Sequence, residues 1–433
     1  MIWWVYNLLF PVVFACLLPR YIVRMLRRGG YAKDFLQRFG RYGKETAEKL
    51  SAGGDAVWVQ AVSVGELGVA QTFMEALRKE RPGVRFVVTT NTSTGYALAK
   101  KKVSGADVAL YFPVDTPGVM RRVLRRIAPK AVVLVENELW PNLIRRAGKE
   151  GVPVALVNGR ISDHSYKGYR KLRFLTRRLL PGVSLFCAQS RGDADKLVAL
   201  GAPAERVVAT GSAKYDIAET GEAARVRAAR WVAALRPDGG APVVVGGSTW
   251  PGEEAVLLDW AKRARERHPG LLLVLVPRHA ERRAEVLEAI AARGLSVAQR
   301  SRLADDASDA PAGADVLLVD TTGELRGFYA VADAVFVGKS LTEKGGQNPI
   351  EPAKDGRAVV VGPHMENFRG VADDFTAAGA WVRAKDASEV GATLNRWLDD
   401  PAERRRVGEA AAALVSARSG ATADMARRVA ALW

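Results

Sequence analysis

The chain has 433 residues, 48% of them hydrophobic and 26% charged, which is long enough for two globular domains and excludes a disordered or fibrous protein. Two distant cysteines, Cys16 and Cys187, and only four histidines argue against a disulfide scaffold and a dedicated zinc site. Residues 1–220 hold 35 Lys and Arg against 18 Asp and Glu, whereas residues 221–433 hold 29 of each kind, so the net charge of +17 belongs to the N-terminal half. This asymmetry predicts that the N-terminal half faces a polyanion: nucleic acid, an anionic membrane surface or a phosphorylated substrate.

An apolar segment opens the chain. Residues 2–18 carry no charge, include Trp3, Trp4 and Tyr6, and are followed by four arginines within residues 20–28. The segment is shorter than the ~20 residues that span a bilayer, and the arginines are typical of the cytoplasmic side. We predict a single N-terminal anchor over residues 1–28 with the rest of the chain cytoplasmic; a helix lying in the membrane interface is the alternative.

Two series of strands and helices follow. In the first, strands are expected at 56–62, 84–90, 108–112, 131–136 and 152–158, with helices at 65–79, 94–102 and 119–127. In the second, strands are expected at 242–246, 271–276, 316–319, 334–337 and 358–361. Short apolar runs alternating with amphipathic helices indicate doubly wound α/β domains with parallel sheets. A breaker cluster at 237–240 favours a domain over residues 29–215, a linker over 216–240 and a second domain over 241–410.

Polar residues follow several of these strands. Glu66 comes just after the first strand, where it could act in a cleft or complete a capping box with Ser63. Glu136 and Glu138 follow a buried strand, where carboxylates are costly unless they are solvated or used. Lys214 lies near the predicted domain junction.

Three further features suit anions. Arg278 follows the strand at 271–276, and a Gly-Gly pair at 345–346 leads into a helix with a proline near its start. The helix at 119–127 carries four arginines on one face, which is either a solvated surface or a contact with a membrane or lipid phosphate. These arginines are Arg121, Arg122, Arg125 and Arg126.

Ten motifs in series resemble those of the Kdo transferases, which add 3-deoxy-D-manno-octulosonic acid (Kdo) to lipid A precursors. The motifs are AVSVGE (61–66), FPVD (112–115), ELWPN (138–142), NGRIS (158–162), GSAKYD (211–216), GGSTWPGEE (246–254), VPRH (276–279), DTTGEL (320–325), GGQNPIEPA (345–353) and GPHMENF (362–368). They span almost the whole chain in order, and the N-terminal apolar segment also matches the family.

The resemblance implies a GT-B type glycosyltransferase, with two facing Rossmann-like domains, a cleft between them and a C-terminal helix over residues 411–433 that packs back toward the N-terminal domain. It implies inverting transfer of Kdo from CMP-Kdo to a lipid A precursor (lipid IVA) in lipopolysaccharide core biosynthesis at the bacterial inner membrane. CMP-Kdo is then a substrate, and no cofactor or metal is needed. The expected partners are the glycolipid and an anionic membrane surface, not nucleic acid.

The resemblance also assigns residue roles. Glu66 matches the family's proton acceptor. Glu136 matches an acidic position that stabilises the transition state, with Glu138 as the second choice, and Lys214 matches a second stabilising residue. The positions that match CMP contacts are Pro277, Arg278, Gly323, Glu324, Leu325, Asn348, Pro349, Ile350 and Glu351.

Two other functions remain open from the sequence. A nucleotide-sugar 2-epimerase would share the two-domain architecture, but it would leave the SVGE motif and the anchor unexplained. A basic nucleic-acid-binding protein would explain the net charge of +17. However, the basic pairs lack interleaved exposed aromatic residues and any recognisable reading motif.

Overall fold

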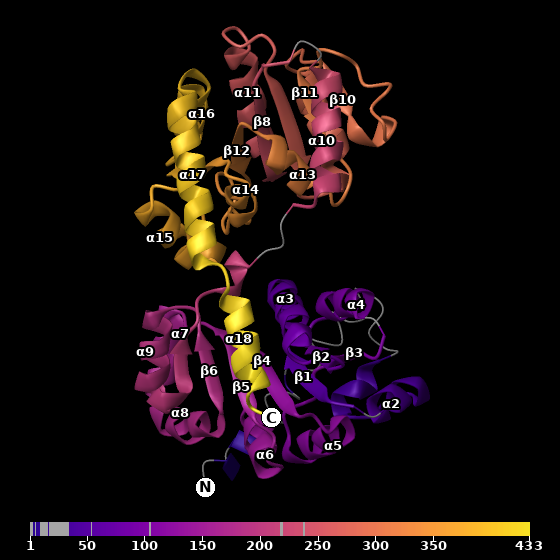
Figure 1. Ribbon diagram of the computed structural model, residues 1–433, viewed down its shortest axis with the longest axis vertical. Helices are drawn as coiled ribbons and strands as arrows, with labels where there is room; N and C mark the ends of the chain where they lie inside the picture. Colours follow the sequence, from indigo (N-terminus) through magenta and orange to yellow (C-terminus); the bar gives the residue numbers. More distant parts are fainter. Residues whose placement is uncertain are drawn as a thin grey trace. The chain divides into compact units, whose positions relative to one another are not determined.

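The computed structural model describes residues 3–4, 6–8, 16, 34–52, 54–103, 105–216, 220–236 and 239–433. The chain divides into two compact units: unit 1 comprises Met1–Asp216 with Ser419–Trp433, and unit 2 comprises Ile217–Arg418 (Figure 1). Most of the expected anchor, residues 1–28, lies outside the described residues. Within the described ranges, no helix is long and apolar enough to cross a bilayer.

Unit 1 is built on a seven-stranded sheet in the order β3-β2-β1-β4-β5-β6-β7, with parallel pairing throughout. Its strands are β1 (Ala56–Gln60), β2 (Arg85–Thr90), β3 (Val108–Tyr111), β4 (Ala131–Val135), β5 (Val154–Gly159), β6 (Leu185–Ala188) and β7 (Val207–Ala209). Its helices are α2 (Lys44–Ser51), α3 (Val64–Glu80), α4 (Ser93–Lys102), α5 (Pro117–Ile127), α6 (Pro141–Lys149), α7 (Asp163–Lys171), α8 (Arg173–Leu179), α9 (Arg191–Leu200) and α18 (Ala421–Ala430).

The strands β1 to β6 are buried along their whole length, which is why apolar residues dominate most of them. Alternate residues of β1 belong to opposite faces. Val57 and Val59 join the core that contains residues of α3 and α18, whereas Trp58 joins the core that contains residues of α5 and α6. The strands therefore hold their carboxyl ends at one fixed edge.

Unit 2 repeats this plan, with the strand order β10-β11-β9-β8-β12-β13-β14 and parallel pairing. Its strands are β8 (Val243–Thr249), β9 (Leu272–Pro277), β10 (Val297–Gln299), β11 (Val316–Leu318), β12 (Ala334–Val337), β13 (Ala358–Val361) and β14 (Val382–Arg383). Its helices are α10 (Glu222–Leu235), α11 (Glu253–Ala264), α12 (Arg283–Ala291), α13 (Leu325–Val331), α14 (Ile350–Lys354), α15 (Arg369–Ala377), α16 (Ala387–Asp399) and α17 (Pro401–Arg418). The prediction of two doubly wound parallel α/β domains is confirmed.

The C-terminal stretch differs from the single helix expected over residues 411–433. Helix α17 ends at Arg418 in unit 2, and α18 begins at Ala421 in unit 1, lying beside α3 (Figure 1). The break occurs at Gly420, whose φ of 98° suits glycine. Asp216 accepts hydrogen bonds from the backbone N–H groups of Gly420 and Thr422, so the GSAKYD motif fixes the start of α18.

The stretch expected as a linker, residues 216–240, is mostly helix. Helix α10 packs against α13 in unit 2 and buries Ala228, Trp231 and Leu235. Its three buried residues recur at helical spacing, and this periodicity is hidden in a sequence rich in Arg and Ala. The strands β6, β7, β10 and β14 were also not predicted.

Candidate active site

Three carboxylates lie at the carboxyl edge of the unit 1 sheet. Glu66 follows β1 in the first turn of α3, and Glu136 and Glu138 follow β4, which is the neighbour of β1. Their charges act on one another: Glu136 raises the pKa of Glu66, and both Glu66 and Glu136 raise the pKa of Glu138. The structure therefore brings together the three acids that the sequence analysis singled out.

Glu66 is held by the start of α3. The backbone N–H of Val62 donates to Oε2 at 2.7 Å, and the Ser63 hydroxyl donates to Oε1 at 3.0 Å. Ser63 Oγ in turn accepts from the Glu66 N–H at 3.3 Å, so the capping box considered in the sequence analysis is present. Burial raises the pKa of Glu66, and the bonds from Val62 and Ser63 oppose the shift. Each carboxylate oxygen keeps a further lone pair, so the cap leaves Glu66 able to accept a proton.

Glu136 and Asn158 have strained backbones at the ends of β4 and β5. Their φ angles are 62° and 54°, in the left-handed region that non-glycine residues rarely adopt. The Glu136 N–H donates to Val157 O at 3.0 Å, and Asn158 Nδ2 donates to Glu136 Oε1 at 3.5 Å. Strain of this kind persists only where the surroundings enforce it, and it gathers at functional sites.

Lys214 joins the same edge through Asn158. It lies in the 3-10 helix η4 (Ala213–Tyr215), where the Ala213 N–H donates to Asn158 Oδ1 at 3.0 Å. Burial lowers the pKa of Lys214; the negative charge of Glu136 opposes this shift, and the positive charge of Arg160 adds to it. The edge thus combines carboxylates with the ammonium group of Lys214, whose protonated form is stabilised by the negative charge of Glu136.

Glu138 titrates in the neutral range. Burial raises its pKa from 4.5 to about 7, and the charges of Glu66 and Glu136 contribute to the rise. Trp140 Nε1 donates to Glu138 Oε2 at 2.7 Å, and the Gln60 side chain also hydrogen-bonds this carboxyl, which opposes the shift. Because Glu138 holds a proton more tightly than an ordinary glutamate, it is the acid of the cluster best placed to stay partly protonated at pH 7.

Four residues of this edge were not singled out from the sequence: Gln60, Trp140, Asn158 and Arg160. Trp140 lies in the ELWPN motif, and Asn158 and Arg160 lie in NGRIS, so motif membership was the signal available for them. Gln60 is a polar residue that ends an otherwise apolar strand.

In unit 2, the residues expected to contact CMP share one edge of the sheet. Pro277 ends β9, and the N–H of the next residue, Arg278, donates to Thr249 O of the neighbouring strand β8 at 3.0 Å. Residues 323–325 follow β11, and residues 348–351 follow β12. Because β11, β9, β8 and β12 are consecutive in the sheet, these three segments reach the same edge.

Arg278 and Glu351 lie within electrostatic reach of each other. Burial raises the pKa of Glu351, and the charges of Arg326 and Arg278 oppose the shift. Asn348 Nδ2 donates to Glu351 Oε1 at 3.3 Å, which orients the carboxylate. The remaining lone pairs of the Glu351 carboxylate can accept hydrogen bonds from the hydroxyl groups of a ligand.

Two details of unit 2 differ from a simple anion site. Helix α14 has five residues, and the N–H of its first residue, Ile350, already donates to Asn348 Oδ1 at 3.1 Å. The first N–H of the helix after the Gly-Gly pair is therefore already occupied by a side chain of the chain itself. Arg300 Nε donates to the Glu324 carboxylate at 3.1 Å, and the Thr321 hydroxyl also donates to it. This leaves the backbone of residues 323–325 for the expected contact with CMP.

The described residues contain no group of three or more His, Cys, Asp or Glu side chains that could hold a metal ion. Positive charge is nevertheless present at both edges, as Lys214 in unit 1 and Arg278 in unit 2.

The sequence is similar to known glycosyltransferases over nearly its full length. A sequence model of the family described as "3-Deoxy-D-manno-octulosonic-acid transferase (kdotransferase)" matches residues 33–217. A 3-deoxy-D-manno-octulosonic acid transferase of Bordetella pertussis is 39% identical over 410 residues, which are 92% of this chain and 92% of the relative. Another, of Haemophilus influenzae, is 29% identical over 88% of this chain and 87% of the relative.

Solved structures share the fold. The UDP-GlcNAc 2-epimerase from Neisseria meningitidis bound to UDP-GlcNAc matches with a TM-score of 0.55 and 12% identity, over 88% of this chain and 99% of that chain. A glycosyltransferase from Rickettsia africae matches with a TM-score of 0.54 and 12% identity, over 87% of this chain and 97% of that chain. At such identities the likeness shows the fold alone, which is GT-B-like.

The coupling among the carboxylates can be tested directly. Glu66→Gln should lower the pKa of Glu138 from about 7, because it removes a negative charge that helps to raise that pKa. The titration can be followed by 13C NMR of labelled glutamate side chains, with Glu138→Gln to assign the signal. Glu75→Gln replaces an exposed glutamate of the same helix and should leave the titration unchanged. An unshifted Glu138 midpoint in the Glu66→Gln variant would contradict the coupling.

Proposed function

The chain belongs to the 3-deoxy-D-manno-octulosonic acid (Kdo) transferase family, and we propose that it transfers Kdo, with inversion, from CMP-Kdo to a lipid A precursor (lipid IVA). Its membership makes it a Kdo-type glycosyltransferase. The observation that carries the proposed mechanism is the edge of unit 1, where Glu66, Glu136 and Lys214 meet. A base can activate the acceptor hydroxyl, and a cation and a second carboxylate can stabilise charges that develop in a metal-free glycosyl transfer.

Glu66 acts as the base in this proposal. It takes the proton of the acceptor hydroxyl while that oxygen bonds to the anomeric carbon of Kdo and the bond from that carbon to the CMP phosphate breaks. The raised pKa of Glu66 brings its proton affinity closer to neutral pH, which favours general base catalysis. The bonds from Val62 and Ser63 restrict the orientation of the carboxylate.

Glu136 and Lys214 stabilise the transition state in the same proposal. The Lys214 ammonium offsets the negative charge that develops on the departing CMP phosphate. Glu136 favours the charged form of Lys214 and can balance positive charge that develops on the sugar ring. Glu138 is the second choice for the role of Glu136, because it belongs to the same cluster. The transfer requires the two sheet edges to meet across the expected cleft, which stays a prediction.

Unit 2 binds the donor in this proposal. Arg278 contacts the phosphate of CMP, and Glu351 accepts hydrogen bonds from the ribose hydroxyls. The common sheet edge and the electrostatic contact between Arg278 and Glu351 support this assignment. The remaining proposed CMP contacts are Pro277, Gly323, Glu324, Leu325, Asn348, Pro349 and Ile350.

A basic pocket of unit 1 supports a further part of the proposal, contact with an anionic membrane surface. The pocket has a volume of about 590 Å³ and is lined by Gly40, Tyr42, Gly118, Arg121, Arg122, Arg125 and Arg126. In the described part of the chain, Glu150 is the one acidic side chain that pairs with any of these arginines, at 3.9 Å from Arg125. Because so little negative charge from the protein offsets these four arginines, they can bind the phosphates of lipid headgroups.

The described N-terminal residues are attached next to this region. The Tyr6 hydroxyl donates to Asp115 Oδ2 at 2.8 Å just before α5, and the Arg145 guanidinium of α6 lies 4.4 Å from the centre of the Trp3 ring. Trp4 and Leu8 remain 81% and 72% exposed. Exposed apolar side chains beside a basic surface are typical of membrane-associated proteins. We include residues 1–28 in the proposal as the anchor at the bacterial inner membrane, with both units on the cytoplasmic side.

The membrane contact predicts a specific effect of charge removal. The triple variant Arg121→Gln, Arg125→Gln, Arg126→Gln should float with vesicles containing phosphatidylglycerol at least several-fold less than the wild type, because about 1 kcal/mol of attraction is lost per arginine. Arg122 is kept because it donates to Phe39 O at 2.7 Å. The matched control replaces the exposed Arg227, Arg230 and Arg263 of unit 2 with Gln. Equal flotation of both triple variants with the wild type would contradict the proposed contact.

We propose that the transfer needs no metal or other cofactor, since Lys214 and Arg278 supply positive charge for the phosphate. Turnover, measured as CMP release with a lipid IVA acceptor, should therefore continue in excess EDTA. A loss of turnover in EDTA that Mg²⁺ or Mn²⁺ restores would overturn this part of the proposal.

Glu66→Gln separates the base from the cap. Gln can still cap α3, so the melting temperature should barely change, whereas kcat should fall by ~100-fold or more if Glu66 takes the proton. Asp193→Asn is a matched control, because Asp193 forms the equivalent capping box with Ser190 at the start of α9. It should leave kcat nearly unchanged. Near wild-type kcat in Glu66→Gln would return Glu66 to a structural role.

The alternative functions receive less support. A 2-epimerase shares the fold at 12% identity, but the relative that is 39% identical is a Kdo transferase. The nucleic-acid interpretation depended on the net charge. The basic pocket of unit 1, together with the exposed apolar side chains of Trp4 and Leu8, favours a membrane surface as the polyanion.

A further inference from the structure

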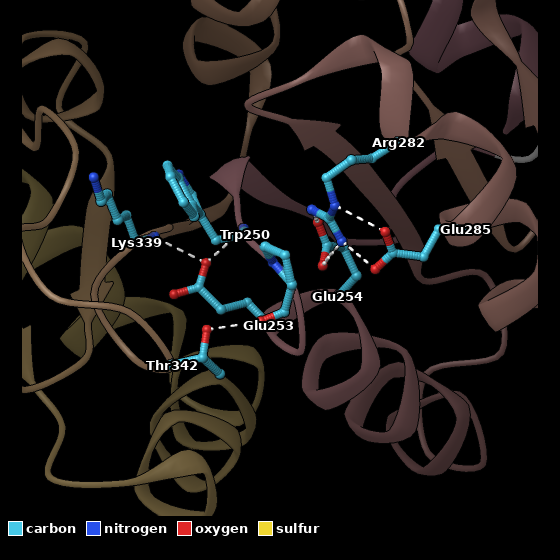
Figure 2. A network of polar contacts seen from close by, with 8 residues as sticks. Trp250, Glu253, Glu254, Arg282, Glu285, Lys339 and Thr342 are labelled. Carbon is cyan, nitrogen blue, oxygen red and sulfur yellow. Dashed lines mark hydrogen bonds and ion pairs between the residues drawn. The ribbon is translucent and has the colours of Figure 1, made fainter.

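A fully buried carboxylate ties two loops together at the carboxyl edge of unit 2 (Figure 2). Glu253, the first residue of α11, accepts backbone N–H bonds from Trp250 and Lys339 at 2.9 Å each. It also accepts from Ser340 and Leu341 at 3.0 Å each. A buried carboxylate is costly unless its oxygens are hydrogen-bonded, and these four bonds satisfy both of them. Glu253 therefore fixes the loop after β8 against the loop after β12.

The backbone is strained where these loops leave the sheet. Ser248, the penultimate residue of β8, and Lys339, just after β12, have φ angles of 53° and 56°, in the left-handed region. Between the loops, a Cβ added to Gly338 would lie 2.4 Å from Ser248 O and 2.7 Å from Thr249 Cα, so the two backbones touch. The left-handed backbone at Lys339 persists because the surrounding contacts impose it. Because Lys339 lies next to the proposed donor site, we interpret its strained backbone as a means of fixing where its side chain lies.

The strained residue carries a cation that is held over an aromatic ring. Lys339 Nζ lies 4.3 Å from the centre of the Trp250 ring, and the His279 ring meets the same indole edge-on at 5.4 Å. Within the described residues, Lys339 forms no ion pair with an acidic side chain. Trp250 thus limits the freedom of the ammonium without neutralising its charge.

The acids of this motif do not compete for Lys339. Glu253 is occupied by four backbone N–H groups. Glu254 accepts two bonds from Arg282, at 2.7 and 3.2 Å, and Figure 2 shows this pair beside the Glu253 network. Lys339, Trp250 and Arg278 follow β12, β8 and β9, three consecutive strands. The edge therefore presents two cations, Arg278 and Lys339, on either side of Trp250 along the strand order.

We propose that Lys339, held over Trp250 by Glu253, binds the carboxylate of the donor's sugar acid, and that Glu253 is its positioning residue. The inference rests on the proposed function, since it names the group of CMP-Kdo that this edge recognises. An ulosonic acid carries its carboxylate on the anomeric carbon, which also bears the phosphate, so the donor presents two anions side by side. Arg278 takes the phosphate, and Lys339 takes the carboxylate. The second cation gives the site a preference for sugar acids over neutral sugars.

Equilibrium binding without acceptor tests the assignment. The probes are CMP, which carries the phosphate alone, and CMP-Kdo, which carries both anions. Lys339→Met should weaken binding of CMP-Kdo by about tenfold or more while the Kd of CMP changes by less than about twofold, because a charge-assisted bond to the carboxylate is lost. Lys339→Arg should recover most of the affinity. Lys344→Met, at an exposed lysine of the same loop, is the matched control and should bind both probes like the wild type.

Each remaining outcome overturns the proposal. Equal weakening of CMP and CMP-Kdo in Lys339→Met would assign Lys339 to the phosphate, and unchanged affinities would remove it from the site. Wild-type turnover with a lipid IVA acceptor is measured separately. Its absence would refute the proposed transfer, whereas the two binding constants report on Lys339 without any transfer.

Glu253→Gln tests the positioning role. Gln keeps one acceptor oxygen but loses the other, so the loop after β12 should be released. Binding of CMP-Kdo should weaken more than binding of CMP, at a melting temperature that confirms folding. Parallel loss of both affinities would mean that Glu253 only maintains the structure of the edge. If the variant does not fold, the Lys339 variants still decide the assignment of the carboxylate.

Discussion

Parallel pairing is the constraint on which both sites depend. Strands that run in one direction all end at the same edge, so the residues that follow β1, β4 and β5 must meet, as must those that follow β8, β9 and β12. The apolar strands are buried on both faces and cannot shift without moving a whole core. Polar residues up to 148 positions apart in sequence, such as Glu66 and Lys214, therefore gather at one edge without any local signal that joins them.

Backbone strain is concentrated at these edges. Four non-glycine residues with positive φ lie at the carboxyl ends of strands: Glu136, Asn158, Ser248 and Lys339. In each unit a side chain holds the strained turn, through Asn158 beside Glu136 in unit 1 and through Glu253 beside Lys339 in unit 2. The stability of the sheets supports this strain, and the strained turns set where the charged groups can lie.

The sequence predicted the central strands of each sheet better than the short strands at the sheet edges. Runs such as those of β4 and β9 are continuous and apolar, and a buried parallel strand leaves little else as an interpretation. In contrast, β7, β10 and β14 are edge strands of two or three residues, too short to show a period. The acids after strands were visible because carboxylates there are costly. Glu253 was not, because an acid at a helix start resembles an ordinary cap, and its partners Lys339, Ser340 and Leu341 come from a distant part of the sequence.

The protonation of the three carboxylates of unit 1 is best understood when they are treated as one coupled group. Neighbouring acids that interact strongly do not all ionise at neutral pH, and the proton stays on the acid with the highest affinity for it. Burial and its acidic neighbours raise the pKa of Glu138 to about 7, whereas the bonds from Val62 and Ser63 stabilise the ionised form of Glu66. The negative charge of Glu136 in turn stabilises the charged form of Lys214. A proton on Glu138 removes its repulsion of the Glu66 charge and so favours the ionised form of Glu66, which is the form that the proposed base needs. Glu138, the second choice for direct participation in the proposed transfer, thus favours the ionised form of the proposed base, Glu66.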